Sequence, residues 1–173
     1  MIVPPEWYLT KDQSWMAMAF IAGRRSLCDR SRTGAVIVSV QNRIVATGYN
    51  GPPARYAPAD DRTCSHWCAR AADGATDAGQ GYLSCPAIHA EANALLYASR
   101  RDVEGGTLYV TRVPCWDCAK LISNSGLAAV TCVIDDPADA ERNTEAAIKM
   151  MTDSGLDVTY AVARYGSSLH IVK

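Results

Sequence analysis

Three side chains of the types that bind zinc stand near the starts of two expected helices. His89 and Glu91 open one of them, and Cys115 and Cys118 stand in the PCWDC segment, residues 114–118, that opens the other. Cysteines three positions apart lie on the same side of one helical turn. One imidazole and two thiolates occupy three positions of a tetrahedral zinc ion and leave the fourth for water, as in catalytic sites.

Such a site supplies hydrolytic chemistry, because zinc lowers the pKa of its bound water to about 7. Glu91 is not needed as a ligand and stands beside His89, so we expect it to move the proton from water to the departing group. The chemistry indicated is attack on an amidine-like ring carbon with loss of ammonia. The alternative, a structural zinc knuckle, suits a lone C-x-x-C, but the paired H-x-E and P-C-x-x-C favour catalysis.

The elements that must position these residues follow from the apolar periodicity and from the turn signals. Thr10 and Gln13 form a capping box at the start of the first helix. The pattern predicts helices at 11–27, 89–99, 114–125 and 143–153 and strands at 34–40, 44–48, 107–113, 127–134 and 156–163. The first two strands form an antiparallel hairpin, and strands joined by helices run parallel. We therefore expect a three-layer α/β/α sandwich with a mixed five-stranded sheet.

Composition excludes several other classes of protein. The 173 residues include 17 basic and 18 acidic side chains, which suits one domain over residues 1–173 and disfavours a nucleic-acid scaffold. Neither a secretion signal nor an apolar run of roughly 20 residues is present, so we expect no membrane contact and a cytoplasmic location. In a reducing compartment the seven cysteines indicate metal binding rather than disulfides. Three of them fall in an insertion at about 51–86.

The motifs together resemble the cytidine/deoxycytidylate deaminase superfamily, and most of all its deoxycytidylate (dCMP) deaminases. The resemblance runs from about residue 11 to 135 and is carried by GAVIV (34–38), TGYNG (47–51), HAEANA (89–94), LYVT (108–111) and the PC…KLI segment (114–122). It implies a cytidine deaminase-like fold. It also implies that His89, Cys115 and Cys118 bind the catalytic zinc, that Glu91 is the catalytic proton shuttle, and that dCMP is converted to dUMP and ammonia.

The same resemblance implies substrate-binding residues. Asn50 would bind the sugar and phosphate end of the nucleotide, the backbone of Ala35 would face the base, and Tyr97 and Arg100 would lie near the site and a subunit interface. The alternatives are an ordinary Asn-Gly turn and an amphipathic helix face. The candidate cations for the phosphate are Arg24, Arg25, Arg32, Arg55 and Arg112, and most arginines are solvated surface groups. Of these we favour Arg24 and Arg32.

Some dCMP deaminases carry a second, structural zinc ion, and this chain has spare ligands for one. We expect four ligands drawn from Cys28, Cys64, Cys68, Cys85 and His66. The chain departs from the family at Ala87, where a histidine ligand would stand. The alternative is that these are free, partly buried thiols. Cys132, on an apolar strand, is a core residue.

The sequence allows alternatives for the substrate and for the class of protein. Another cytosine nucleotide, such as dCTP or a 5-modified dCMP, is an alternative substrate, and a non-catalytic structural zinc module is the alternative of a different class. Adenosine deaminases that act on transfer RNA have a short connection where this chain has its long insertion. The resemblance further implies a homo-oligomer, a hexamer or a dimer, with dCTP and dTTP as effectors.

Overall fold

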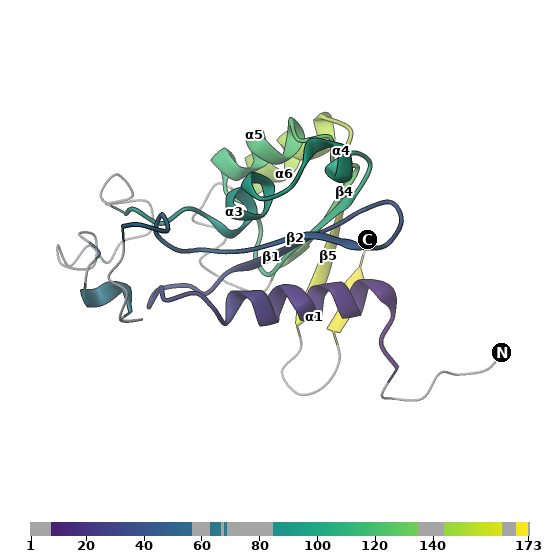
Figure 1. Ribbon diagram of the computed structural model, residues 1–173. Coiled ribbons are helices and arrows are strands. Elements are labelled where there is room, and N and C mark those ends of the chain that lie inside the picture. The colour runs from purple at the N-terminus through teal and green to yellow at the C-terminus, as the bar shows by residue number, and fades with distance from the viewer. Residues whose placement is uncertain are drawn as a thin grey trace.

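A mixed six-stranded sheet is the centre of the protein. The computed structural model describes residues 8–56, 63–66, 68, 85–134, 144–163 and 169–172. The strands are β1 (Gly34–Val38), β2 (Ile44–Tyr49), β3 (Thr107–Val110), β4 (Ala129–Val133), β5 (Asp157–Ala163) and β6 (Leu169–Val172). They lie in the order β2-β1-β3-β4-β5-β6 (Figure 1).

The strand directions follow the predicted pattern. β1 is antiparallel to both β2 and β3, with Val36 opposite Thr47 on one side and Tyr109 on the other. β3, β4 and β5 are mutually parallel. The sixth strand, β6, pairs antiparallel with β5 and was not predicted from the sequence. The five expected strands therefore all form, and the sheet gains one strand at its edge.

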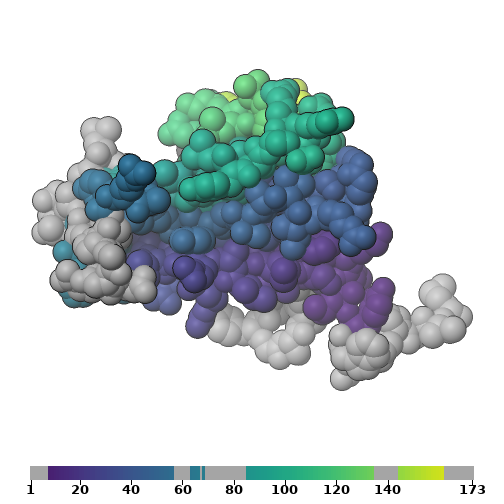
Figure 2. Space-filling view, in the orientation of Figure 1, coloured from purple at the N-terminus to yellow at the C-terminus, as the bar shows by residue number. Residues whose placement is uncertain are grey.

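Helices cover both faces of this sheet. One face carries α1 (Lys11–Gly23), and the other carries α3 (Ala90–Leu96), α4 (Arg100–Val103), α5 (Trp116–Ser123) and α6 (Thr144–Asp153). Two apolar cores result: Met16 of α1 packs on Val36 and Tyr109, while Ile122 of α5 belongs to the core on the opposite face. Figure 2 shows the same layers from outside, with the first hairpin between α1 and the upper helices. The predicted three-layer α/β/α sandwich is confirmed.

The first helix begins as predicted and ends earlier. The Thr10 hydroxyl accepts from the N–H of Gln13, and the Gln13 side chain accepts from the N–H of Thr10, which is the predicted capping box. The helix stops at Gly23 and not at residue 27. The buried hydroxyl of Ser26 donates to the carbonyl of Asn50 over 2.7 Å, and this contact draws the chain away from the helix axis toward the end of β2.

The helix predicted over 89–99 is shorter than expected, because α3 ends at Leu96. A separate helix, α4, follows from Arg100, and its N-cap residue Ser99 accepts from the N–H of Asp102 through its side chain. The Cys-rich part of the chain contributes only the short helix Cys64–His66 to the described residues. Within the described part of the chain, no helix is long and apolar enough to cross a membrane.

Candidate metal centre

His89 caps the start of α3 and is held there from two directions. The chain just before it is fixed by a bridge between Gly51 and Ile88, whose backbone N–H groups donate to each other's carbonyls over 3.1 and 2.8 Å. The helix just after it lies against β2, where the Asn93 side chain donates to the carbonyl of Tyr49 over 2.8 Å. The imidazole is thus tied to the carboxyl end of β2.

The two cysteines enter the site from the start of α5. Cys115 is the N-cap residue of this helix, and Cys118 lies in its first turn with 3% of its surface exposed. The segment that leads to Cys115 follows the carboxyl end of β3 and includes the buried Val113 and Pro114. Burial of these two side chains anchors the start of α5 to the core, and with it both sulfur atoms.

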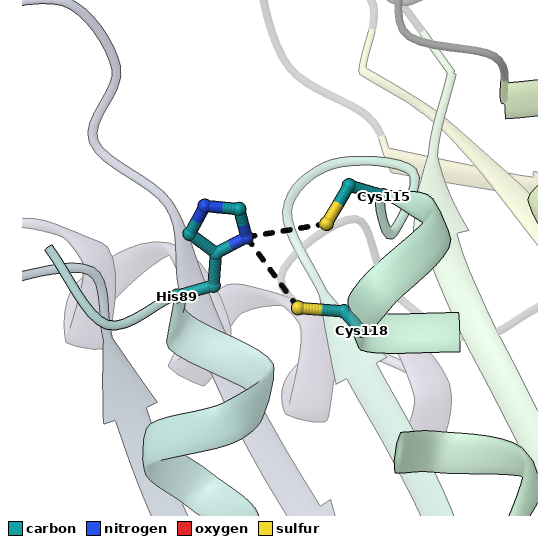
Figure 3. A group of neighbouring side chains, drawn as sticks. All are labelled: His89, Cys115 and Cys118. Atoms are coloured by element: carbon teal, nitrogen blue, oxygen red, sulfur yellow. Dashed lines mark hydrogen bonds between the residues drawn. The ribbon is translucent and has the colours of Figure 1, made fainter. Parts of the chain in front are cut away.

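The three predicted ligands converge (Figure 3). The Nδ1 atom of His89 lies 3.3 Å from Sγ of Cys115 and 3.4 Å from Sγ of Cys118. All three donor atoms lie within 4.8 Å of one another, and among the described residues no other His, Cys, Asp or Glu side chain joins the group. Spacing along the sequence therefore predicted a cluster that two different helices build in space.

The donor geometry fits zinc. With Zn–N of about 2.05 Å and Zn–S of about 2.3 Å at tetrahedral angles, the nitrogen and sulfur atoms should stand about 3.6 Å apart. The observed separations of 3.3 and 3.4 Å need only a small expansion. A tetrahedral ion held by one nitrogen and two sulfurs keeps one position for water or substrate, so the donor set is of the catalytic kind.

The electrostatics of the cluster already favour one thiolate. Donation from Cys118 and from His89 outweighs burial and lowers the pKa of Cys115 to about 4. The pKa of Cys118 is raised, because its proton is shared with Cys115 and because it is buried and faces the charge of Glu91. The first turns of α3 and α5 add the partial positive charge of helix N-termini, which stabilises anions.

Glu91 lies in the first turn of α3 with 4% of its surface exposed. Its charge also helps to raise the pKa of Cys118, one of the three predicted ligands. A carboxylate this deeply buried is costly unless it is hydrogen-bonded or has a chemical use. This agrees with the interpretation of the H-x-E motif, in which the histidine binds the metal and the nearby glutamate does not.

Asn50 and Ala35 both lie near the edge of the sheet that carries the cluster. Ala35 is fully buried in β1. The amide of Asn50 is used within the protein: its Oδ1 accepts from the N–H of Thr33 over 2.8 Å, and its Nδ2 donates to the carbonyl of Ser31 over 2.8 Å. Asn50 therefore holds the α1–β1 loop, residues 29–33, a role that the Asn-Gly motif did not predict.

The other predicted substrate residues lie on the surface. Arg24 caps the end of α1 and Arg32 belongs to the α1–β1 loop, and both are exposed. Tyr97 is 77% exposed at the carboxyl end of α3. Because His89 starts this helix, the structure does not bring Tyr97 to the metal cluster.

Among the described residues, the structure does not bring the expected ligands of a second zinc ion into one group of three or more donors. Cys64 is buried, and its pKa is raised to about 11, chiefly by burial, with a smaller increase from the adjacent Cys28. The Cys64 sulfur accepts from the N–H of Asp29, and its thiol donates to the Asp29 carboxylate over 3.8 Å. The other expected ligands of a second zinc ion, Cys68, Cys85 and His66, form no group of three donors within the described residues. Cys132 is fully buried in β4, as expected.

Two features of the site edge were missed from the sequence. Arg112 was one of several candidate cations, but its bond to Ser31, with Nη1 donating to the hydroxyl over 2.9 Å, was not foreseen. Gly48, in the TGYNG motif, carries a signal that could have found the second feature, because a glycine inside a strand often marks a close approach of another backbone. It lies directly under α3.

Residues 9–134 match the family model described as the cytidine and deoxycytidylate deaminase zinc-binding region. The chain therefore belongs to the cytidine and deoxycytidylate deaminase family, and His89, Cys115 and Cys118 are its zinc site.

Proteins named deoxycytidylate deaminase are similar to this chain over most of their length. The deoxycytidylate deaminase of Mycobacterium phage D29 is 45% identical over 126 residues, 73% of this chain and 93% of the relative. That of Mus musculus is 37% identical over 143 residues, 80% and 73% of the two chains. The crystal structure of dCMP deaminase from cyanophage S-TIM5 in complex with dCMP and dUMP has a TM-score of 0.64 and 24% identity. The match covers 88% of this chain and 99% of the cyanophage chain. This last likeness concerns the fold alone.

Proposed function

We propose that the protein catalyses the hydrolytic deamination of dCMP to dUMP and ammonia, acting as a single domain over residues 1–173 with an insertion at about 51–86. The observation that carries the proposal is the buried Glu91 beside a three-donor zinc group. The likeness to deoxycytidylate deaminases of a phage and a mouse supports this substrate.

In this mechanism His89, Cys115 and Cys118 would hold a zinc ion, which when bound would supply a water whose pKa is near about 7. Glu91 would accept a proton from the attacking water and deliver it to N3 of the cytosine ring as the water oxygen adds to C4. It would then carry the second water proton to the amino group, and cleavage of the C4–N bond would release ammonia and leave dUMP.

The proposal extends to the nucleotide contacts. The backbone of Ala35 would face the base, and the Asn50 amide, which can make further hydrogen bonds besides its two in the protein, would reach the sugar. Arg24 and Arg32 would contribute positive charge toward the phosphate. Tyr97 would act from the end of α3, where its exposure suits a subunit contact better than direct contact with the base.

A second, structural zinc ion is proposed at Cys28 and Cys64, with further ligands from Cys68, Cys85 and His66. The interaction of Cys28 with the buried Cys64 thiol, which helps to raise the pKa of Cys64, supports it. Metal analysis of purified protein should give two zinc ions per chain, and Cys28→Ser should give one. A single zinc ion in the unmodified protein would reject this site.

We further propose a homo-oligomer, a hexamer or a dimer, that responds to dCTP and dTTP and works in the cytoplasm. The exposed Leu96 and Tyr97 offer apolar surface for a subunit contact. Light scattering on the eluting protein would give the mass of the assembly. Rates with each nucleotide added would reveal the effectors.

The function is tested by ammonia release from zinc-loaded protein with dCMP, CMP, deoxycytidine and dCTP at equal concentration. We expect the highest kcat/KM with dCMP. A higher value with dCTP would move the assignment to another cytosine nucleotide. A higher value with deoxycytidine, or no turnover of any substrate, would reject it.

A further inference from the structure

The α1–β1 loop, residues 29–33, lies against the segment that leads into the zinc ligands. Gly34 and Thr111 bind each other through two hydrogen bonds of 3.0 Å, the N–H of Gly34 to the Thr111 hydroxyl and the N–H of Thr111 to the Gly34 carbonyl. Arg112 follows directly and stands three positions before Cys115. Three extended residues span at most about 11 Å, so the Arg112 backbone is within one nucleotide length of the zinc site.

Arg112 turns toward this loop. Its Nη1 donates to the Ser31 hydroxyl over 2.9 Å, and that hydroxyl lies 3.2 Å from the hydroxyl of Thr33. Arg112 is half-buried, whereas Arg24 and Arg32, the cations favoured from the sequence, are exposed. A planar guanidinium suits phosphate, because its N–H groups match two phosphate oxygens at once.

The loop is shaped before any ligand arrives. The two hydrogen bonds of the Asn50 amide fix the backbone on either side of residue 32, at Ser31 and Thr33. The carbonyl of Asn50 is itself fixed by the buried Ser26 hydroxyl. The Ser31 hydroxyl is therefore held in place by the loop backbone, which lowers the entropy cost of binding.

The charge of the loop also suits an anion. Arg30 and Arg32 flank Ser31, and the carboxylate of Asp29, the one acidic residue of the loop, accepts from the N–H of Ser65 over 3.0 Å. We propose that Arg112 and Ser31 bind the 5′-phosphate of the nucleotide and so select a nucleoside monophosphate over a nucleoside. This inference rests on the proposed function, and it names the residues that recognise the phosphate.

The first test is the binding of dUMP to the zinc-loaded protein, measured by calorimetry. Arg112→Ala should weaken dUMP binding about 10- to 100-fold, the usual effect of losing a hydrogen bond to a charged group. Arg101→Ala is the matched control, since it removes the same charge from an exposed position on α4, and should stay within twofold. Inorganic phosphate should compete with dUMP in the unmodified protein and not in Arg112→Ala.

A merely structural role of Arg112 predicts a different result. In that case Arg112→Ala would reduce kcat/KM for dCMP and for deoxycytidine by the same factor, and this outcome overturns the inference. The expected outcome is a loss with dCMP alone, with partial recovery in Arg112→Lys. Should Arg112→Ala not fold, Ser31→Ala gives the same comparison with a smaller loss.

Different results would contradict the phosphate assignment and the proposed function. An unmodified protein that turns over dCMP, with the same preference for dCMP over deoxycytidine in Arg112→Ala, overturns only the phosphate assignment. An unmodified protein that neither binds dUMP nor deaminates dCMP overturns the function and the assignment together.

Discussion

Gly48 in β2 touches the backbone of Ala90 at the start of α3. A Cβ atom built on Gly48 would stand 2.1 Å from the carbonyl oxygen of Ala90 and 2.6 Å from the nitrogen of Ala94. Ala90 separates the zinc ligand His89 from Glu91. The positions of both functional side chains therefore depend on the missing side chain of Gly48.

Gly48→Ala should push α3 away from the sheet, because backbone atoms cannot move aside as a flexible side chain can. We expect a loss of about 1–3 kcal/mol in the free energy of unfolding, together with weaker zinc binding. Thermal unfolding and a zinc competition titration would measure the two effects. Gly51→Ala is the control, since its Cβ would meet only the Tyr49 ring at 3.7 Å, and equal losses in both variants would contradict this explanation.

Glu91→Gln keeps the size of the side chain and removes its ability to accept a proton. We expect normal zinc content and an unchanged melting temperature, with kcat reduced about 10²- to 10⁴-fold. Glu145→Gln, at an exposed position on α6, should retain full activity. Unreduced turnover of dCMP by Glu91→Gln would remove the proton-shuttle role.

Removal of zinc by a chelator should abolish deamination and lower the melting temperature, and added zinc should restore both. A ligand that binds only the folded state at 100 times its Kd adds about 2.7 kcal/mol of stability. Calorimetric scans with and without the metal would measure the shift. Full activity of chelated protein in which metal analysis finds no zinc would show that deamination does not require the metal.

Zinc binding should release about one proton per catalytic site near pH 7. The pKa of about 4 makes Cys115 a thiolate already at that pH, whereas the raised pKa of Cys118 keeps this thiol protonated until the metal displaces its proton. Zinc affinity should therefore rise with pH between about 5 and 8, by close to tenfold per unit. Calorimetry in buffers with different heats of ionisation counts the protons, and a pH-independent affinity would refute the assignment.

The sequence was most informative where function fixes the spacing of residue types. The positions of His89, Cys115 and Cys118 predicted a three-donor zinc site, and the structure brings the three together. The parallel order of β3, β4 and β5 followed from the helices between these strands, since short right-handed crossovers leave little choice.

Features that depend on single long-range contacts were not predictable. The early end of α1 reflects the bond from Ser26 to Asn50, which joins residues far apart in sequence. The use of the Asn50 amide to hold the α1–β1 loop depends on the same packing. β6 escaped prediction because a short edge strand carries little periodic signal of its own.

The bridge between Gly51 and Ile88 brings together the two ends of the long connection between β2 and α3. Closing a longer loop at fixed ends costs little extra free energy, since the cost grows only with the logarithm of its length. Residues can therefore be added to or deleted from the middle of this connection with little disturbance to the imidazole that follows the bridge. Evolution can alter the connection while the chemistry at the zinc site is preserved, and protein engineers can exploit the same independence.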